Sequence, residues 1–280
     1  MIVYRGMIES DIATALALCR SAGWNQLERD WKIFLALSPN GCRVASQENR
    51  VVGTVTTIRY QNSFSWIGMV LVDANCQRQG IGMKLLNEAL HILQYEETIK
   101  LDATPAGREV YLKLDFIDEY PLVRMSSMGS IEKRKVSFAR SMDKSDLVAV
   151  KEFDHEIFGA CRHELLEWML EGAQHLAFVV KEKKEILGYC LGRNGYKYTQ
   201  IGPIVAKEPA IAKDLLTAAL NNCVGYPVIV DALYFQPEWI EWLTAIGFQE
   251  QRPFTRMYRG NNNFRGIPEK QFTILGPEFG

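Results

Sequence analysis

The chain has 280 residues, of which 48% are hydrophobic and 23% are charged. This composition predicts a packed globular protein, long enough for one large domain or two of ordinary size. Its 32 basic and 33 acidic residues give a net charge of -1. That balance argues against a protein that coats nucleic acid, because such proteins carry a strong basic excess.

No apolar run reaches the ~20 residues that a membrane-spanning helix needs. The N-terminal MIVYRGMIESD also lacks the hydrophobic region of a signal peptide. The six cysteines are scattered, with no C-x-x-C pair, which favours free thiols in a reducing compartment. The four histidines show no ligand spacing either. We therefore expect a cytoplasmic protein with no membrane partner and no metal.

Hydrophobic periodicity and turn residues predict the elements of the first half. In chain order these are helices over 11–22 and 27–37, strands over 42–45, 51–60 and 64–72, a helix over 81–94, a strand over 99–103, a helix over 106–114, and strand structure over 116–125. Asn62-Ser63 is expected at a hairpin tip. The fold class is α/β, with a mixed sheet and at least one βαβ crossover.

A polar segment, residues 126–135, is typical of a linker. The second half then repeats the first in order: QIGPIVA matches WIGMVLV, VIVDA matches IKLDA, and Arg256-Met257 match Arg124-Met125. These matches indicate a duplicated fold. We expect one domain over 1–130 and a second over 136–280.

The junction between strand 64–72 and helix 81–94 contains two glycines, Gly80 and Gly82. Glycines at such a turn let backbone N–H groups approach a ligand, and the helix start adds unpaired donors and a positive dipole end. The pattern suits a phosphate site, although an ordinary turn is the alternative. A dinucleotide fingerprint fails because its third glycine is Leu85, and a triphosphate loop fails because Met83 follows Gly82.

Val72, Gln77, Gly80 and Gly82 fit the spacing V-x-x-x-x-Q-x-x-G-x-G. This resembles the pyrophosphate loop of the GNAT superfamily of acyl-CoA-dependent N-acyltransferases. The stretches VVGTVTTIRY, WIGMVLVD, LDATPAGREVYLKLDF and IGPIVA extend the resemblance to a bacterial family of tandem GNAT proteins. In that family a complete N-terminal GNAT domain precedes a degenerate C-terminal one, and the loop after IGPIVA here indeed has no glycine.

The resemblance implies an acetyl-CoA site in the first domain. It assigns the pantetheine arm and acyl carbonyl to the strand residues Met69, Val70, Leu71 and Val72. It assigns the pyrophosphate to the loop residues Gln77, Arg78, Gln79, Gly80, Ile81, Gly82 and Met83. A bulky side chain at Gly80 or Gly82 should block the cofactor.

Tyr111 is the catalytic candidate that the resemblance implies, as the proton donor to the departing thiolate. A core tyrosine is the alternative. Asp115 stands where the family has glycine, at an expected left-handed position that Asp tolerates better than most residues. No general base is assigned. Asp102 ends a strand near the expected cleft, but we favour a role for it as the cap of the next helix.

The acceptor site is predicted at Trp24 and Asn25, which follow the first helix, and at Asp154 and Arg162 in the second half. Trp24 would offer an aromatic wall and Asn25 an amide. Asp154 could hold an amine and Arg162 a carboxylate, whose geometry matches the guanidinium fork. A helix cap and a surface ion pair are the alternatives for the last two.

The predicted activity is transfer of an acetyl group from acetyl-CoA to a primary amine, directly and within a ternary complex. A small-molecule acceptor is favoured over a protein, and no nucleic acid is expected. The alternative is an acyl-CoA-binding sensor or interaction protein without turnover, and a dinucleotide-dependent enzyme comes third. The acceptor's identity and the oligomeric state stay open.

Overall fold

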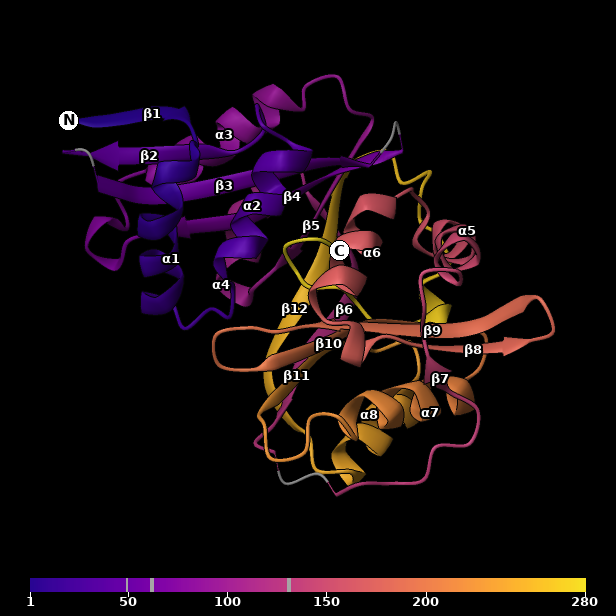
Figure 1. Ribbon diagram of the computed structural model, residues 1–280. Helices are drawn as coiled ribbons and strands as arrows, with labels where there is room; N and C mark the ends of the chain where they lie inside the picture. The colour runs from indigo at the N-terminus through magenta and orange to yellow at the C-terminus, as the bar shows by residue number, and fades with distance from the viewer. Residues whose placement is uncertain (49, 61–62, 130–131) are drawn as a thin grey trace.

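The computed structural model describes residues 1–48, 50–60, 63–129 and 132–280 (Figure 1). The elements of the first half are β1 (Ile2–Gly6), α1 (Ile12–Ser21), α2 (Glu28–Leu37), β2 (Arg43–Gln47), β3 (Arg50–Tyr60), β4 (Phe64–Val72), α3 (Ile81–Ile92), β5 (Thr98–Ala103), α4 (Pro105–Leu112) and β6 (Ile117–Ser127). Those of the second are β7 (Arg140–Ser141), α5 (Leu147–Phe158), α6 (His163–Gly172), β8 (Phe178–Glu182), β9 (Glu185–Arg193), β10 (Thr199–Ala206), α7 (Pro209–Leu220), β11 (Val228–Leu233), α8 (Pro237–Ala245), β12 (Gln249–Gly260) and β13 (Gln271–Thr273).

All these strands form a single mixed sheet in the order β1-β2-β3-β4-β5-β12-β6-β11-β13-β10-β9-β8-β7. The two halves exchange strands at its centre. β12 of the second half pairs with β5 of the first, and β6 of the first half pairs with β11 of the second. Figure 1 shows β6 and β12 running together between the two halves. Three strand pairings, β5–β12, β12–β6 and β6–β11, therefore join the two sides of the predicted boundary near residue 130.

Two buried ion pairs accompany this exchange. Arg256 on β12 donates to both carboxylate oxygens of Asp102 on β5, at 2.8 and 2.9 Å. Arg124 on β6 donates to both oxygens of Asp231 on β11, at 2.7 and 2.8 Å. Each pair thus joins the two halves. These residues occupy the repeated positions noted in the sequence, so the repeat's Asp and Arg meet across the halves.

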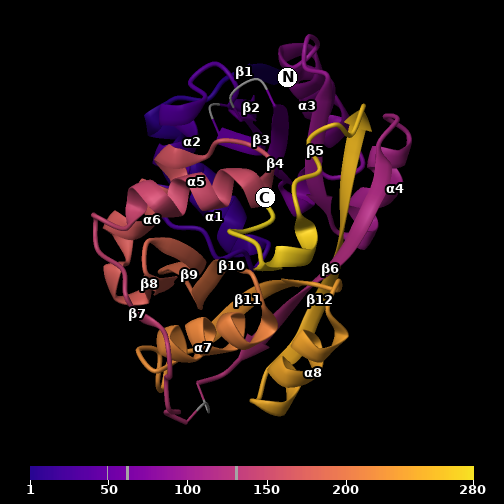
Figure 2. The same cartoon turned by 90° about the vertical axis from the view of Figure 1, so that its right-hand side faces the viewer.

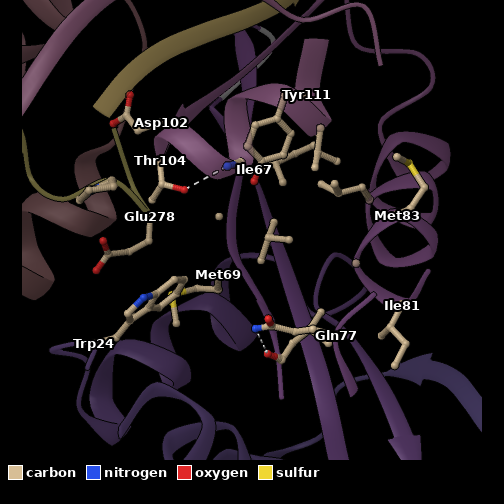
Figure 3. Close-up of a pocket in the computed structure, with 18 of the residues that line it drawn as sticks. Trp24, Ile67, Met69, Gln77, Ile81, Met83, Asp102, Thr104, Tyr111 and Glu278 are labelled. Atoms are coloured by element: carbon tan, nitrogen blue, oxygen red, sulfur yellow. Dashed lines mark hydrogen bonds between the residues drawn. The ribbon is translucent and has the colours of Figure 1, made fainter. Parts of the chain in front are cut away.

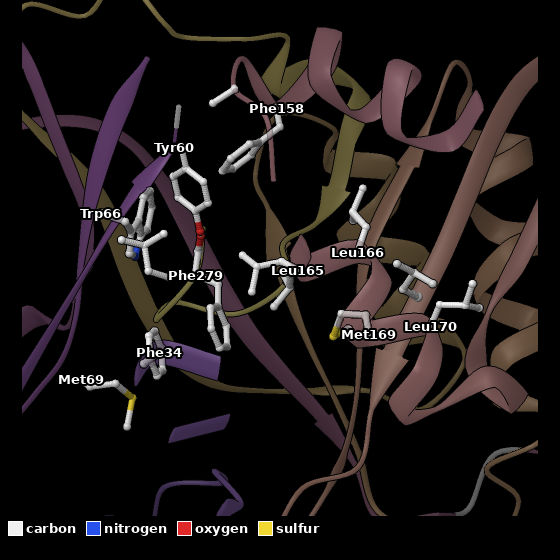
Figure 4. Packing of buried hydrophobic residues seen from close by; sticks show 14 of the residues in the cluster. Phe34, Tyr60, Trp66, Met69, Phe158, Leu165, Leu166, Met169, Leu170 and Phe279 are labelled. Carbon is white, nitrogen blue, oxygen red and sulfur yellow. The ribbon is translucent and has the colours of Figure 1, made fainter. Parts of the chain in front are cut away.

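The largest core is shared as well. It contains Phe34 from α2, Tyr60 from β3 and Phe158 from α5, together with Phe279 near the chain end (Figure 4). The Phe34 and Phe279 rings stack with centroids 4.6 Å apart, and the Tyr60 hydroxyl donates to the Phe279 carbonyl. The residues after β12 therefore return to the middle of the molecule. Figure 2 shows the C-terminus there, between the upper strands and the lower helices α7 and α8.

The predicted helices and strands are confirmed, with small shifts at their ends. β6 runs on to Ser127, so the predicted linker begins two residues too early. Asp115 has φ 62°, the left-handed conformation expected of it. Of the predicted hairpin tip, Asn62 lies outside the described residues.

All six cysteines are free thiols. In the part of the chain that the structure describes, no helix has the length and apolar character to span a membrane. Within the same ranges, no group of three or more His, Cys, Asp or Glu side chains is placed to hold a metal.

Candidate active site

The strands β4 and β5 pair only at their beginnings and then diverge. Their parallel ladder consists of Ser65 with Ile99 and Trp66 with Lys100. Further along β4, Met69 has φ 53°, and the register with β3 shifts at this point. The Thr54 hydroxyl stabilises the irregular backbone by donating to the Met69 carbonyl at 2.7 Å. The β4 edge that faces β5 is therefore left without a strand partner beyond Trp66, where a ligand can lie against it.

The loop after β4, residues 73–80, leads to an uncapped helix start. Gly80 is the N-cap of α3 with φ 79°, a conformation that L side chains rarely adopt, and no side chain caps the helix. The first backbone donation in this turn comes from Lys84 to the Gly80 carbonyl, at 3.0 Å. The N–H groups of Ile81, Gly82 and Met83 have no acceptor among the described residues. Such a cluster of free donors favours an anion.

One cavity, of about 470 Å³, joins this helix start to the splayed strand and to the chain end. Figure 3 shows Met83 and Ile81 at one end, Tyr111 and Thr104 along one wall, and Trp24 with Glu278 at the other end. Both charged and apolar side chains line it. We call the part of the cavity around Ile81 and Met83 the loop end, and the part around Trp24 and Glu278 the tail end.

Tyr111 comes from α4, one residue before the end of that helix. Its ring lies against Gly107, where an added Cβ would come within 3.0 Å of the ring, and 5.8 Å from the Phe116 ring. Its hydroxyl has no hydrogen-bond partner in the described part of the chain, although the side chain lines the cavity. Burial raises the pKa of Tyr111 to about 12. The phenol is therefore protonated at neutral pH and available as a donor.

The tail end is built by two segments that are far apart in the sequence. Gln26 follows α1, and its Nε2 donates to Glu278 Oε1 at 2.9 Å. Arg193 donates to the same oxygen, so Glu278 Oε2 has no side-chain donor among the described residues. Burial raises the pKa of Glu278, but Arg193 and Gln26 outweigh it and hold that pKa below its usual value. A carboxylate is therefore present at the tail end at neutral pH.

Comparison with known families accounts for this arrangement. The acetyltransferase (GNAT) family model matches residues 10–116, and a second model, the acetyltransferase (GNAT) domain, matches residues 150–273. The chain belongs to the GNAT superfamily. It carries two GNAT domains in tandem and is an acyl-CoA-dependent acyltransferase.

Relatives of this tandem GNAT protein span most of its length. A holothin acyltransferase from Pseudoalteromonas sp. (strain SANK 73390) is 24% identical, over 92% of this chain and 87% of its own. The uncharacterized N-acetyltransferase YitH of Bacillus subtilis is 22% identical over 86% of each. A solved putative acetyltransferase from Pyrococcus horikoshii shares the fold, with a TM-score of 0.83 and 24% identity over 100% of this chain and 96% of that one.

The structure places most of the predicted cofactor residues of the tandem GNAT protein in the cavity lining. These are Met69, Val70, Val72, Gln77, Arg78, Gly80, Ile81, Gly82 and Met83, and Tyr111 and Trp24 line it too. Leu71 and Gln79 do not. Leu71 lies opposite Thr54 in the β3–β4 ladder, and Gln79 is exposed at the outside of the loop.

Three predicted acceptor residues lie elsewhere. Asn25 is buried and clamps the loop between β9 and β10: its Oδ1 accepts from the backbone N–H groups of Lys197 and Tyr198, at 2.9 and 3.0 Å. Asp154 and Arg162 are completely buried and form a two-hydrogen-bond ion pair, both at 2.9 Å. Each of these two charged side chains therefore has its counter-ion inside the core. Tertiary contacts already satisfy these three side chains, and none of them lines the cavity, so their contact with the acceptor stays a prediction.

The predicted capping role of Asp102 was wrong. Both of its oxygens accept from Arg256, and the cap of α4 is Thr104, whose hydroxyl accepts from the Gly107 N–H at 3.2 Å. Burial raises the pKa of Asp102, and Arg256 opposes that rise. Asp102 lines the cavity, but both of its oxygens already accept from Arg256, whereas Glu278 Oε2 has no side-chain donor among the described residues.

The second half of the tandem GNAT protein differs at the equivalent turn. Its loop between β10 and α7 consists of Lys207 and Glu208, and Pro209 begins the helix without a backbone N–H. β10 and β11 also diverge, but β13 lies between them and pairs with both. β13 thus occupies the gap that corresponds to the open gap between β4 and β5.

Sequence reasoning missed four residues of the tail end: Gln26, Arg252, Phe254 and Glu278. Gln26 is the residue after the predicted Trp24-Asn25. Arg252 and Phe254 come from the exchanged strand β12, and Glu278 from the last residues of the chain. None of them belongs to a local motif, so only the fold places them here.

Proposed function

We propose that this tandem GNAT protein transfers an acetyl group from acetyl-CoA to the primary amine of a small molecule. The observation that carries the proposal is the continuity of one cavity. It links the free N–H groups at the start of α3 with the unpaired edge of β4, the Tyr111 hydroxyl and the Glu278 carboxylate. A pyrophosphate, a thioester and an amine would each find complementary groups along it, in that order.

In the proposed reaction the amine nitrogen attacks the thioester carbonyl directly. The N–C bond forms, the C–S bond breaks, and backbone N–H groups at the splayed part of β4 stabilise the oxyanion. Tyr111 donates its proton to the departing thiolate. Its raised pKa, about 12, matches a role as acid rather than base.

The incoming amine must also lose a proton, because a free alkyl amine is mostly charged at neutral pH. Glu278 is the best-placed acceptor for that proton, directly or through water. Its Oε2 has no side-chain donor, whereas both oxygens of Asp102 are engaged by Arg256. Its low pKa makes it a weak base that first orients the ammonium group.

A small acceptor is proposed because protein closes the tail end. The segment after β13, including Pro277 and Glu278, forms part of the cavity wall, and Trp66 Nε1 holds this segment by donating to the Pro277 carbonyl at 3.0 Å. A protein substrate would need this end open. A cytoplasmic location stays a prediction.

The test is a transfer assay with acetyl-CoA and longer acyl-CoAs against a panel of small amines, following thiol release and the acylated product. Binding of CoA is measured on the same samples by calorimetry. Turnover that prefers acetyl-CoA supports the proposal. Tight CoA binding with no acylation of any amine would instead support the sensor alternative.

A further inference from the structure

The tail end of the cavity contains a cation without a counter-ion. Three arginines line the cavity: Arg78 at the loop end, Arg124, and Arg252. Arg124 is paired with Asp231 through two hydrogen bonds. Arg252 makes no ion pair or hydrogen bond with any described residue, and its Nε is completely buried. It stands directly opposite Arg124 in the β12–β6 ladder.

This is an unfavourable position for a free guanidinium. Like charges opposite each other on neighbouring strands destabilise a sheet, and a buried charge is costly unless it is paired. Burial and the neighbouring Arg124 accordingly lower the pKa of Arg252, despite the opposing effect of Asp231 and Glu278. The Phe254 ring also favours the guanidinium, whose carbon is 5.0 Å from the ring centroid. An anion from outside the chain would complete the site.

The same end of the cavity contains an acceptor without a donor. Gln26 is 6% exposed, and its Oε1 has no hydrogen-bond partner in the described chain. The orientation of its amide is fixed, because Nε2 must face the Glu278 carboxylate to which it donates. The free oxygen of Gln26 and the Glu278 carboxylate are therefore prepared for N–H donors, as Arg252 is for an anion.

We infer that the acceptor is an amine that also carries a carboxylate, of the amino-acid type. Its ammonium group is held by Gln26 and Glu278, its carboxylate by Arg252, and its side chain lies along Trp24 and Phe254. This rests on the proposed function and names its substrate class. A carboxylate fits better than a phosphate dianion, because one guanidinium balances one charge and matches it with two hydrogen bonds, while Asp102 and Glu278 repel further negative charge.

The experiment compares acceptors that differ only in the anion. Each of the common amino acids is tested with its decarboxylated amine and its carboxamide, with acetyl-CoA saturating, on wild type, Arg252→Gln, Arg252→Lys and the surface control Arg265→Gln. Arg265 is exposed and pairs with Glu269 outside the cavity. We expect acetylation of at least one amino acid at a kcat/KM roughly 10- to 100-fold above its two neutral analogues, the range typical for a charged hydrogen bond.

Arg252→Gln should remove that preference through KM and be partly rescued by Arg252→Lys, while Arg265→Gln keeps the activity and the preference of wild type. A structural role for Arg252 is tested by thermal unfolding of the free protein. We expect Arg252→Gln to melt at or above the wild-type temperature, because it removes an unpaired, partly buried charge that lies opposite Arg124.

Equal turnover of charged and neutral acceptors, or an Arg252→Gln protein that melts lower and loses both activities alike, would overturn the inference while leaving acetyl transfer intact. Absence of transfer to every compound, with CoA still bound, would defeat the proposed function and the inference with it.

Discussion

The two halves of the protein share the same order of strands and helices, but they differ at the turn where a central strand leads into a helix. After β4 the chain makes a loop over residues 73–80 and starts α3 with free N–H groups at a glycine. After β10 only Lys207 and Glu208 intervene, and Pro209 starts α7 beside a carboxylate side chain. A helix N-terminus favours an anion, but Glu208 and the missing N–H remove that preference. A few residues at one turn thus give the two helix starts opposite preferences for an anion.

The halves also differ in what fills the gap between their diverging strands. The gap between β10 and β11 holds β13, whereas the gap after Trp66 on β4 opens into the cavity. The segment that follows β13 then supplies Glu278 to the first half. The second half therefore supplies part of the wall of the cavity that the first half begins.

The strongest test of this comparison is to separate the halves. We expect residues 1–135 alone to form no stable monomer, because β12 would be missing from the edge of β5 where it pairs from Thr255 to Gly260. Co-expression with residues 136–280 should restore a folded complex. Circular dichroism and size-exclusion chromatography would follow both. A folded monomeric first half would contradict the reciprocal exchange as a requirement for folding.

The two exchanged ion pairs should differ in their importance. Asp231→Ala leaves Arg124 buried beside Arg252 without a counter-ion, whereas Asp102→Ala leaves Arg256 with the Tyr120 hydroxyl at 2.8 Å. Breaking a buried pair costs about 3–5 kcal/mol, and we expect Asp231→Ala to lie at the upper end. Urea unfolding measures both. In the double variant Asp231→Ala/Arg124→Met most of the loss should disappear; an equal loss there would exclude the unpaired charge as its cause.

Tyr111 distinguishes catalysis from binding within the first half. Tyr111→Phe should lower kcat by about 10²- to 10³-fold, the effect of losing a general acid, with CoA affinity unchanged. The exposed Tyr95→Phe is the matched control. Because the protonated phenol is active and its pKa is about 12, wild-type rates should not fall on ionisation of Tyr111 below about pH 11. A Tyr111→Phe variant with full activity would assign the proton donation to another group.

The two helix starts can be compared with one substitution in each. Gly82 and Ala210 are the second residues of α3 and α7. A Cβ at Gly82 meets only Val72, at an ordinary 3.5 Å, so Gly82→Leu should fold and place its side chain in the cavity. We expect at least a ~100-fold loss of acetyl-CoA affinity, about 2.7 kcal/mol, and none for Ala210→Leu. Calorimetry decides; unchanged binding by Gly82→Leu would place the cofactor elsewhere.

The smallest effect concerns an Arg–Asp ion pair that occurs near the start of each half, and we call each of these two pairs a corner. Arg5 donates to both oxygens of Asp11, and Arg140 to both oxygens of Asp146, which Lys181 also contacts at 3.0 Å. Hydrogen bonds from Arg5 and Arg140 lower the pKa of the two carboxyls. A lowered pKa stabilises the fold above the unfolded value of about 4, and the gain is lost as the pH falls through the folded value.

Asp146→Asn should therefore cost more at pH 7 than Asp11→Asn, because the second corner has the additional lysine. Arg140 is half exposed, so solvent screening limits the difference to about 1 kcal/mol. Thermal melts at neutral pH and at a pH well below 3, where the carboxyl with the lower folded pKa finally protonates, would show it as a smaller pH dependence of stability in the Asp146 variant. Identical pH dependence of both variants would assign no role to Lys181.

Local sequence by itself predicted the elements of the first half other than β1, the duplication, and the glycine-containing turn before α3. The reason is physical, because these signals are local. Strand alternation, helix periodicity and the glycines between Val72 and Met83 each favour a backbone conformation through residues that are close in the sequence. The left-handed Asp115 was predictable for the same reason. The repeated Asp and Arg positions were visible too, but nothing in the sequence showed that each would pair with the other half's partner.

Only the tertiary structure decided the tail end of the cavity and the partners of the buried charges. Asn25, Asp154 and Arg162 have the side chains of a binding site, yet long-range contacts satisfy them inside the core. Gln26 and Arg252 have no motif, yet the exchanged strand and the returning chain end leave them unpaired around one cavity. A polar group's availability depends on every segment packed around it, and that information exists only once the chain has folded.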